Sequence, residues 1–299
     1  MNIDHARLAA LRTGFQTHFQ SGYDAMGAKS MWKLVASFVK SNDKTETYGW
    51  LADLLRMRKW IGPRQIKSLV AQAAVIANEP FELTVGVNRY DILFDKLSTY
   101  EPRFKMMGQA AANNADLLVF ALLKAGFSTN CWDGQFFFDT DHPLLKDDGS
   151  TTTFANTDGG AGAPWFLIDS SKGFLPVIFQ QAIPPQFVSK DKPNDDNVFD
   201  NNTFVYGADS YEAAGYGIPQ LCWGSKQDLT PANYAAARAA MGSYVSGGGQ
   251  PLGIVPDTLV VHPTLESKGN KIVNTETAAG GESNEWKGTA KLVVCPWLA

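Results

Sequence analysis

Three side chains that could carry out chemistry lie close together in the segment spanning residues 131–145. Asp139, Asp141 and His142 place two carboxylates and an imidazole almost side by side in the chain. Such groups can bind a metal ion such as zinc, or they can transfer protons during hydrolysis. A metal-dependent hydrolase centred on these residues is therefore one hypothesis that the sequence raises.

The surrounding residues favour a structural role for this cluster. Asp133-Gly134 and His142-Pro143 are dipeptides typical of turns, where aspartate side chains cap backbone N–H groups. Cys131 lies near His142 in the sequence, but nothing else completes the signature of a nucleophile and its base. No helical metal-binding motif follows, and the remaining histidines are each isolated: His5, His18 and His262. We therefore predict no catalytic residue, no metal site and no cofactor.

The composition argues against several classes of protein. The chain has 299 residues and a formal net charge of −4, whereas a strong nucleic-acid binder would show a basic stripe. No run of ~18 apolar residues that could span a membrane exists, and the N-terminus lacks the apolar run of a secretory signal. The cysteines are odd in number and far apart, which argues against a disulfide framework or a zinc ribbon and fits synthesis in a reducing cytosol: Cys131, Cys222 and Cys295. The charged fraction of 19% lies below the typical ~25% and fits a surface covered by partners.

The segment 98–126 is the element around which the rest must be organised. Apolar residues recur there at steps of three and four, which predicts one face of a helix: Phe104, Met107, Ala111, Ala115, Leu118, Leu122 and Ala125. Pro102 suits the first turn, and Gly126 suits a left-handed stop. A helix over 102–125 would be roughly 36 Å long. It is either a core helix of its own domain or a spine that neighbouring subunits also cover.

A hairpin is predicted immediately before this helix. Residues 66–77 form one expected strand, residues 78–80 a turn, and residues 81–87 a second strand with alternating apolar side chains. An isolated hairpin is only marginally stable, so it should rest on its own domain or on a neighbouring subunit. Residues 3–20 are expected to form an amphipathic helix that ends near Gly22, with the same two alternatives.

The remaining pattern mixes strands and helices irregularly, which predicts the α+β class. Strands are expected at 31–40, within 165–182 and 203–224, near 259–263 and at the C-terminal end. Residues 147–163 and 189–202 are predicted to be loops. Thr230 and Pro231 signal the start of a helix that buries Tyr234, Ala237 and Met241, and a shorter helix is expected within 264–273.

Several motifs in collinear order resemble one known family. The segments 48–69, 131–143, 204–217, 229–241 and 284–294 look like the major head subunit of Mu-like phages and prophages, the gpT family. The similarity runs from about residue 10 to the end of the chain. Because this family resembles tailed-phage capsid proteins of the Hong Kong 97 type, the resemblance implies an α+β capsid fold with an N-terminal arm, an extended hairpin loop, a peripheral domain holding a spine helix, and an axial domain.

The resemblance also implies a division of the chain. Residues 1–45 would be the arm and the first peripheral segment, 46–92 the extended loop with its strands in 66–87, and 93–130 the peripheral domain with the spine helix. Residues 131–280 would be mainly axial domain, and 281–299 would return as a strand to the peripheral domain.

The function that the resemblance implies is structural and not enzymatic. The chain would assemble with itself into hexamers and pentamers of an icosahedral shell in the virion, made in the bacterial host cytoplasm. Scaffold, portal and decoration proteins would be its partners, double-stranded DNA would be enclosed without sequence-specific binding, and no membrane would be involved. Inter-subunit contacts are expected from a basic cluster that could pair with acids in 191–200 of a neighbour: Arg56, Arg58, Lys59, Trp60, Arg64 and Lys67.

Two further hypotheses remain beside the phage head. An encapsulin-like compartment would have the same fold and hold a cargo protein in place of DNA. Some Hong Kong 97-type capsids also join a loop lysine covalently to an asparagine, and Lys67 is the lysine placed for this, although no motif identifies an asparagine partner.

Overall fold

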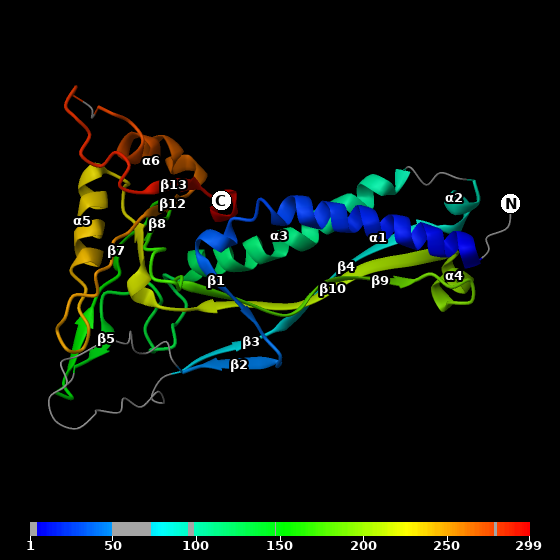
Figure 1. Cartoon of the computed structure of the whole chain (residues 1–299), viewed down its shortest axis with the longest axis horizontal. Coiled ribbons are helices and arrows are strands. Elements are labelled where there is room, and N and C mark those ends of the chain that lie inside the picture. The colour runs from blue at the N-terminus through cyan, green and yellow to red at the C-terminus, as the bar shows by residue number, and fades with distance from the viewer. Residues whose placement is uncertain (1–4, 50–72, 95–98, 147, 278–279) are drawn as a thin grey trace.

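The computed structural model describes residues 5–49, 73–94, 99–146, 148–277 and 280–299. The molecule has an elongated part, in which two long helices lie over a sheet, and a second part at one end that carries the shorter helices α5 and α6 (Figure 1). Among the helices so described, none is both long and apolar enough to cross a membrane.

A four-stranded sheet forms the base of the elongated part. Its order is β1-β9-β10-β4, with β1 parallel to β9 and the other pairs antiparallel. Its strands are β1 (Ala36–Lys40), β9 (Val177–Lys190), β10 (Thr203–Tyr216) and β4 (Glu79–Asn88). Helices α1 (His5–Gly27) and α3 (Glu101–Ala125) run along this sheet, and the short helices α2 (Arg89–Leu93) and α4 (Asp196–Asn201) lie at its far end (Figure 1).

A five-stranded sheet organises the second part, in the order β13-β12-β8-β11-β7. Its strands are β13 (Lys291–Val294), β12 (Thr258–Val261), β8 (Trp165–Ile168), β11 (Cys222–Lys226) and β7 (Thr157–Gly160). Helices α5 (Pro231–Gly242) and α6 (Glu266–Val273) pack beside it. Two separate pairs complete the fold: β2 (Thr45–Tyr48) with β3 (Ala74–Ala77), and β5 (His142–Leu145) with β6 (Thr151–Phe154). Short 3-10 helices occur at Trp32–Leu34, Pro219–Leu221, Pro263–Leu265 and Pro296–Leu298.

The predicted long helix is present as α3, within one residue of its expected start. Phe104, Met107 and Ala115 are buried as expected, whereas Leu118 is only partly covered. The predicted left-handed stop at Gly126 is wrong, because this residue has φ −59° and continues as a right-handed turn. A Cβ at Gly126 would overlap the ring of Phe138, so close packing accounts for the glycine.

Helix α1 extends five residues past its predicted end at Gly22 and packs on α3 of its own chain. Gly22 faces the carbonyl oxygen of Lys105, and Gly108 faces that of Phe19. A Cβ at either glycine would overlap the opposing backbone. Gly22 therefore does not end the helix. The absence of a side chain at this position lets the backbones of α1 and α3 come into contact.

The predicted hairpin pairs differently from the expectation. The strand at 81–87 belongs to β4, which pairs with β10 in the four-stranded sheet. Strand β3 pairs with β2, so the expected pairing of residues 74–77 with 81–87 about a turn at 78–80 is wrong, while residues 66–72 lie outside the described residues. Asn78 does not reverse the chain; its amide instead donates to Ser41 Oγ and the Asp43 carbonyl, which holds β3 beside the turn before β2.

Two other expectations also need correction. The predicted loop 147–163 contains β6 and β7, and the loop 189–202 contains the end of β9 and helix α4. The last strand, β13, pairs with β12 at the edge of the five-stranded sheet. The residues that follow β13 lie against α3, where Lys124 Nζ donates to the Ala299 carbonyl oxygen at 2.9 Å.

Glu212 carries a carboxylate that is buried under α3, with 1% of the residue exposed. Asn114 of α3 and Gln181 of β9 each donate an amide N–H to it at 2.7 Å. Burial raises the pKa of Glu212, and these two donors partly offset that effect. The residue thus joins the spine helix to two strands through polar contacts at the cost of desolvating a charge.

We predict that Gly108→Ala destabilises the subunit, because the new Cβ would push α3 away from the Phe19 carbonyl of α1. Overpacking of this kind costs roughly 1–3 kcal/mol. Gly14→Ala in α1 is the matched control, since nothing lies within 4 Å of its Cβ position. Denaturant unfolding of both purified variants measures the difference. Equal stability of the two variants would contradict the close helix contact.

We also predict that Glu212→Gln changes the pH dependence of stability. The folded protein holds the Glu212 proton at pH values where the unfolded carboxyl, with a pKa of about 4.3, has released it. Stability of the wild type should therefore fall as pH rises through this range. The variant should have the larger free energy of unfolding at neutral pH. This difference from the wild type should vanish as the pH approaches 4.

Urea unfolding at several pH values measures this effect, with Glu79→Gln on exposed β4 as the control. If the free energy of unfolding of Glu212→Gln differs from that of the wild type by the same amount at every pH, a raised pKa of Glu212 is excluded as the cause.

Candidate functional site

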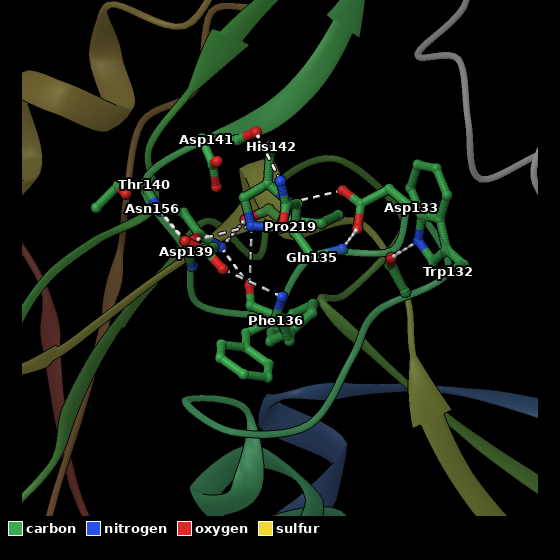
Figure 2. A network of polar contacts seen from close by, with 12 residues as sticks. Trp132, Asp133, Gln135, Phe136, Asp139, Thr140, Asp141, His142, Asn156 and Pro219 are labelled. Carbon is green, nitrogen blue, oxygen red and sulfur yellow. Dashed lines mark hydrogen bonds and ion pairs between the residues drawn. The ribbon is translucent and has the colours of Figure 1, made fainter.

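The predicted chemical cluster forms a buried structural turn between α3 and β5 (Figure 2). His142 is fully buried, and its Nδ1 lies 2.6 Å from Oδ2 of Asp133, whose side chain is 3% exposed. His142 Nε2 lies 3.2 Å from both the Phe137 carbonyl oxygen and Asn156 Oδ1. Both ring nitrogens are therefore occupied by the protein itself.

Asp139 and Asp141 do not join His142 in a common site. The backbone N–H groups of Phe136 and Thr140 donate to the Asp139 carboxylate at 3.3 and 2.7 Å, as in an aspartate-capped turn. Asp141 is exposed, and its backbone carbonyl accepts from the Gln135 side-chain amide at 3.5 Å. Within the described ranges of the chain, no three His, Cys, Asp or Glu residues come together in an arrangement that could hold a metal ion.

The cysteines are equally unsuited to nucleophilic chemistry. Cys131, Cys222 and Cys295 are buried and unbridged. Burial raises the pKa of Cys131 and Cys222, and it raises that of Cys295 to about 12. Since a thiolate is the reactive form, these thiols are inert at neutral pH.

The turn instead fixes the position of the segment that connects α3 to the second part of the molecule. Asn156 Nδ2 donates to the carbonyl oxygens of Phe137 and Pro219, at 2.8 and 3.3 Å, and its Oδ1 accepts from the Asp139 backbone N–H at 2.9 Å. Sequence reasoning missed both Asp133 and Asn156 as partners of His142. The sequence indicates a turn at Asp133 but not that its carboxylate contacts His142. Nothing near Asn156 in the sequence indicates that its side chain contacts this turn.

The predicted contact residues lie outside the described residues: Arg56, Arg58, Lys59, Trp60, Arg64 and Lys67. Their proposed acidic partners are described. Asp191 is 7% exposed and lies 3.7 Å from Arg12. Asp195 accepts from the Lys192 backbone N–H, whereas Asp196 and Asp200 are exposed on α4. Asp196 and Asp200 are thus the most accessible acids of that segment.

We predict that His142→Leu destabilises the subunit by about 3 kcal/mol, because it leaves the buried Asp133 carboxylate without its partner. Asp141→Ala is the matched control and should stay within about 0.5 kcal/mol of the wild type. Thermal and denaturant unfolding measure both variants. Stoichiometric zinc or manganese in the purified wild type, lost on Asp141→Ala, would revive the hydrolase hypothesis.

The whole fold is shared with solved capsid structures of bacteriophage JBD30. The chain in the JBD30 procapsid is 40% identical, with a TM-score of 0.86 over 99% of this chain and 100% of that chain. The chain in the JBD30 capsid is 34% identical, with a TM-score of 0.77 over 100% of both. The α+β fold of the Hong Kong 97 capsid type is thereby confirmed.

Curated relatives cover the chain from end to end. The major capsid protein of Escherichia phage Mu is 38% identical over 307 residues, which span all of both chains. The Mu-like prophage FluMu major head subunit of Haemophilus influenzae is 33% identical over 315 residues, 99% of each chain. The model of the Mu-like prophage major head subunit gpT matches residues 8–298. The chain therefore belongs to the family of Mu-like prophage major head subunits, gpT.

Proposed function

We propose that this major head subunit assembles with copies of itself into hexamers and pentamers of an icosahedral shell that encloses double-stranded DNA. The observation that carries the proposal is the similarity to the JBD30 procapsid chain over essentially the full length of both proteins. The family is one of structural virion proteins and not of enzymes. The turn at His142, with its ring nitrogens occupied, is consistent with a structural role.

We assign roles to the parts of the chain along the predicted divisions. The elongated part with α1, α3 and the four-stranded sheet would be the peripheral domain, and the part with the five-stranded sheet would be the axial domain near the hexamer and pentamer axes. The pairing of β2 with β3 supports an extended loop that leaves the peripheral domain at Thr45 and returns at Ala77. This is narrower than the predicted range 46–92, since β4 belongs to the four-stranded sheet.

The shell would be held together by many moderate interfaces acting at once. A standard interface buries about 1,600 Å², and closed symmetry multiplies the effect of each contact. The exposed apolar side chains of the isolated subunit fit this expectation, with Phe199 87% and Phe94 73% exposed.

Other head proteins would join the shell. The JBD30 capsid is also known decorated with minor capsid protein trimers, and its major chain there is 33% identical to this one, with a TM-score of 0.76 over 90% of this chain and 91% of that chain. We propose that this chain likewise takes a decoration protein, and that a scaffold and a portal take part in assembly.

The basic cluster in 56–67 would contact acidic residues of a neighbouring subunit. We predict that Arg58→Glu combined with Lys67→Glu lowers the yield of shells at least tenfold, because it turns several attractions into repulsions across each repeated interface. Expression with and without the phage scaffold, followed by negative-stain microscopy, measures the yield.

Lys271→Glu combined with Lys291→Glu carries the same charge change on exposed positions of α6 and β13 and is the control. Unaltered shell yield for the Arg58 and Lys67 variant would refute these contacts. A wild type that forms no symmetric particle even with its scaffold would refute the proposed function. Particles from infected cells that hold a protein cargo and no DNA would favour the encapsulin-like compartment, and a ladder above the monomer on a denaturing gel would reveal covalent links through Lys67.

A further inference from the structure

A groove of about 830 Å³ lies beside β1, the edge strand of the four-stranded sheet. Its walls are mainly aromatic and aliphatic: Trp32, Leu34, Phe38, Phe174, Leu175 and Ile178. Phe38 is 53% exposed, so an aromatic surface on this groove remains open in the isolated subunit. An apolar groove that stays open on an isolated subunit is a surface on which another chain can dock.

Exposed lysines lie on the β1 side of this groove. Lys33 is the charged residue among the described residues that line it, and it is exposed. Lys40 ends β1 and is exposed. On the opposite wall Lys172 lies 4.0 Å from Asp169, and the Ser170 hydroxyl donates to Asp257, so that wall carries no free excess of positive charge. The groove would therefore favour a partner that combines an apolar anchor with acidic neighbours.

Helix α4 carries a side chain with that combination. Phe199 is the most exposed large hydrophobic side chain in the described part of the chain, at 87%. Its neighbour Val198 is buried and fixes the helix on the sheet, so Phe199 projects from a firm base. Asp196 and Asp200 are exposed beside it.

The two surfaces cannot meet within one subunit. The groove includes Ile178 near the start of β9, whereas α4 follows the other end of this strand at Lys190 (Figure 1). Twelve residues of extended strand place the two ends roughly 40 Å apart. An α4 helix that enters the groove must then come from another molecule.

We propose that α4 of a second copy of this chain docks in the β1 groove, with Phe199 as the anchor and Asp196 and Asp200 facing Lys33 and Lys40. This inference rests on the proposed assembly of the chain with itself. The contact is head to tail, since it joins different surfaces of the two copies, and such contacts build rings and closed shells when the rotation between copies closes. A buried aromatic anchor with a charged rim is typical of the residues that dominate an interface.

The first experiment traps the contact with cysteines while Phe199 stays in place. Lys40→Cys combined with Asp200→Cys should yield a ladder of cross-linked subunits in assembled shells after mild oxidation, and reductant should remove it. The native cysteines are buried and stay silent. Lys40→Cys combined with Phe94→Cys is the control, because Phe94 is exposed at the same end of the sheet but lies outside α4. Shells that form normally and give no ladder with the first pair would overturn this contact and leave the proposed function standing.

The second experiment tests the anchor and the charges. Phe199→Ala should weaken association at least tenfold in sedimentation velocity or shell yield, whereas Phe199→Tyr, which keeps the aromatic ring, should weaken it less. Lys40→Glu and Asp200→Lys should each reduce assembly, and their combination should restore it. Failure of this rescue together with full assembly of Phe199→Ala would overturn the proposal. A wild type that stays monomeric with its scaffold would overturn it together with the proposed function.

Discussion

The packing of one face of α3 against both sheets is the interaction on which the rest of the subunit depends. Its first half buries Phe104 and Met107 with α1 and the four-stranded sheet, and Phe15 stacks on Phe104 at a ring distance of 4.1 Å. Its second half buries Phe120 and Leu123 with residues of the five-stranded sheet. A single helix is thus a member of two hydrophobic cores, so the two parts of the molecule cannot change their relative position without disturbing it.

Elements whose signals are local were predictable from the sequence. Helix α5 has Thr230 as its N-cap, where the Thr230 hydroxyl accepts from the Asn233 backbone N–H, and Pro231 begins the helix as expected. The ends of α1 and α3 were less predictable, because Gly22 and Gly126 resemble helix stops in the sequence. Both glycines are explained by what approaches them in space, a backbone in one case and an aromatic ring in the other.

Pairings between distant segments could not be predicted in the same way. Strand β4 alternates as a strand should, yet its partner β10 begins more than a hundred residues later, and no local pattern distinguishes that partner from the adjacent β3. The same limit applied to the chemical cluster. Asp139, Asp141 and His142 are close in sequence, but the contacts that define His142 come from Asp133 and Asn156 across the turn.

The distribution of aromatic side chains separates what stabilises the subunit from what remains for its partners. Phe104, Phe137 and Phe166 are fully buried between helices and sheets, so they stabilise the subunit itself. Phe38, Phe94 and Phe199 are mostly exposed at edges and ends of the four-stranded sheet, where burying them within the same chain would require the sheet to fold on itself. The long twisted sheet that gives the subunit its reach therefore also keeps these aromatic side chains outside its own core. When such subunits assemble, the surfaces that carry these exposed aromatic side chains are available for contact with neighbouring subunits.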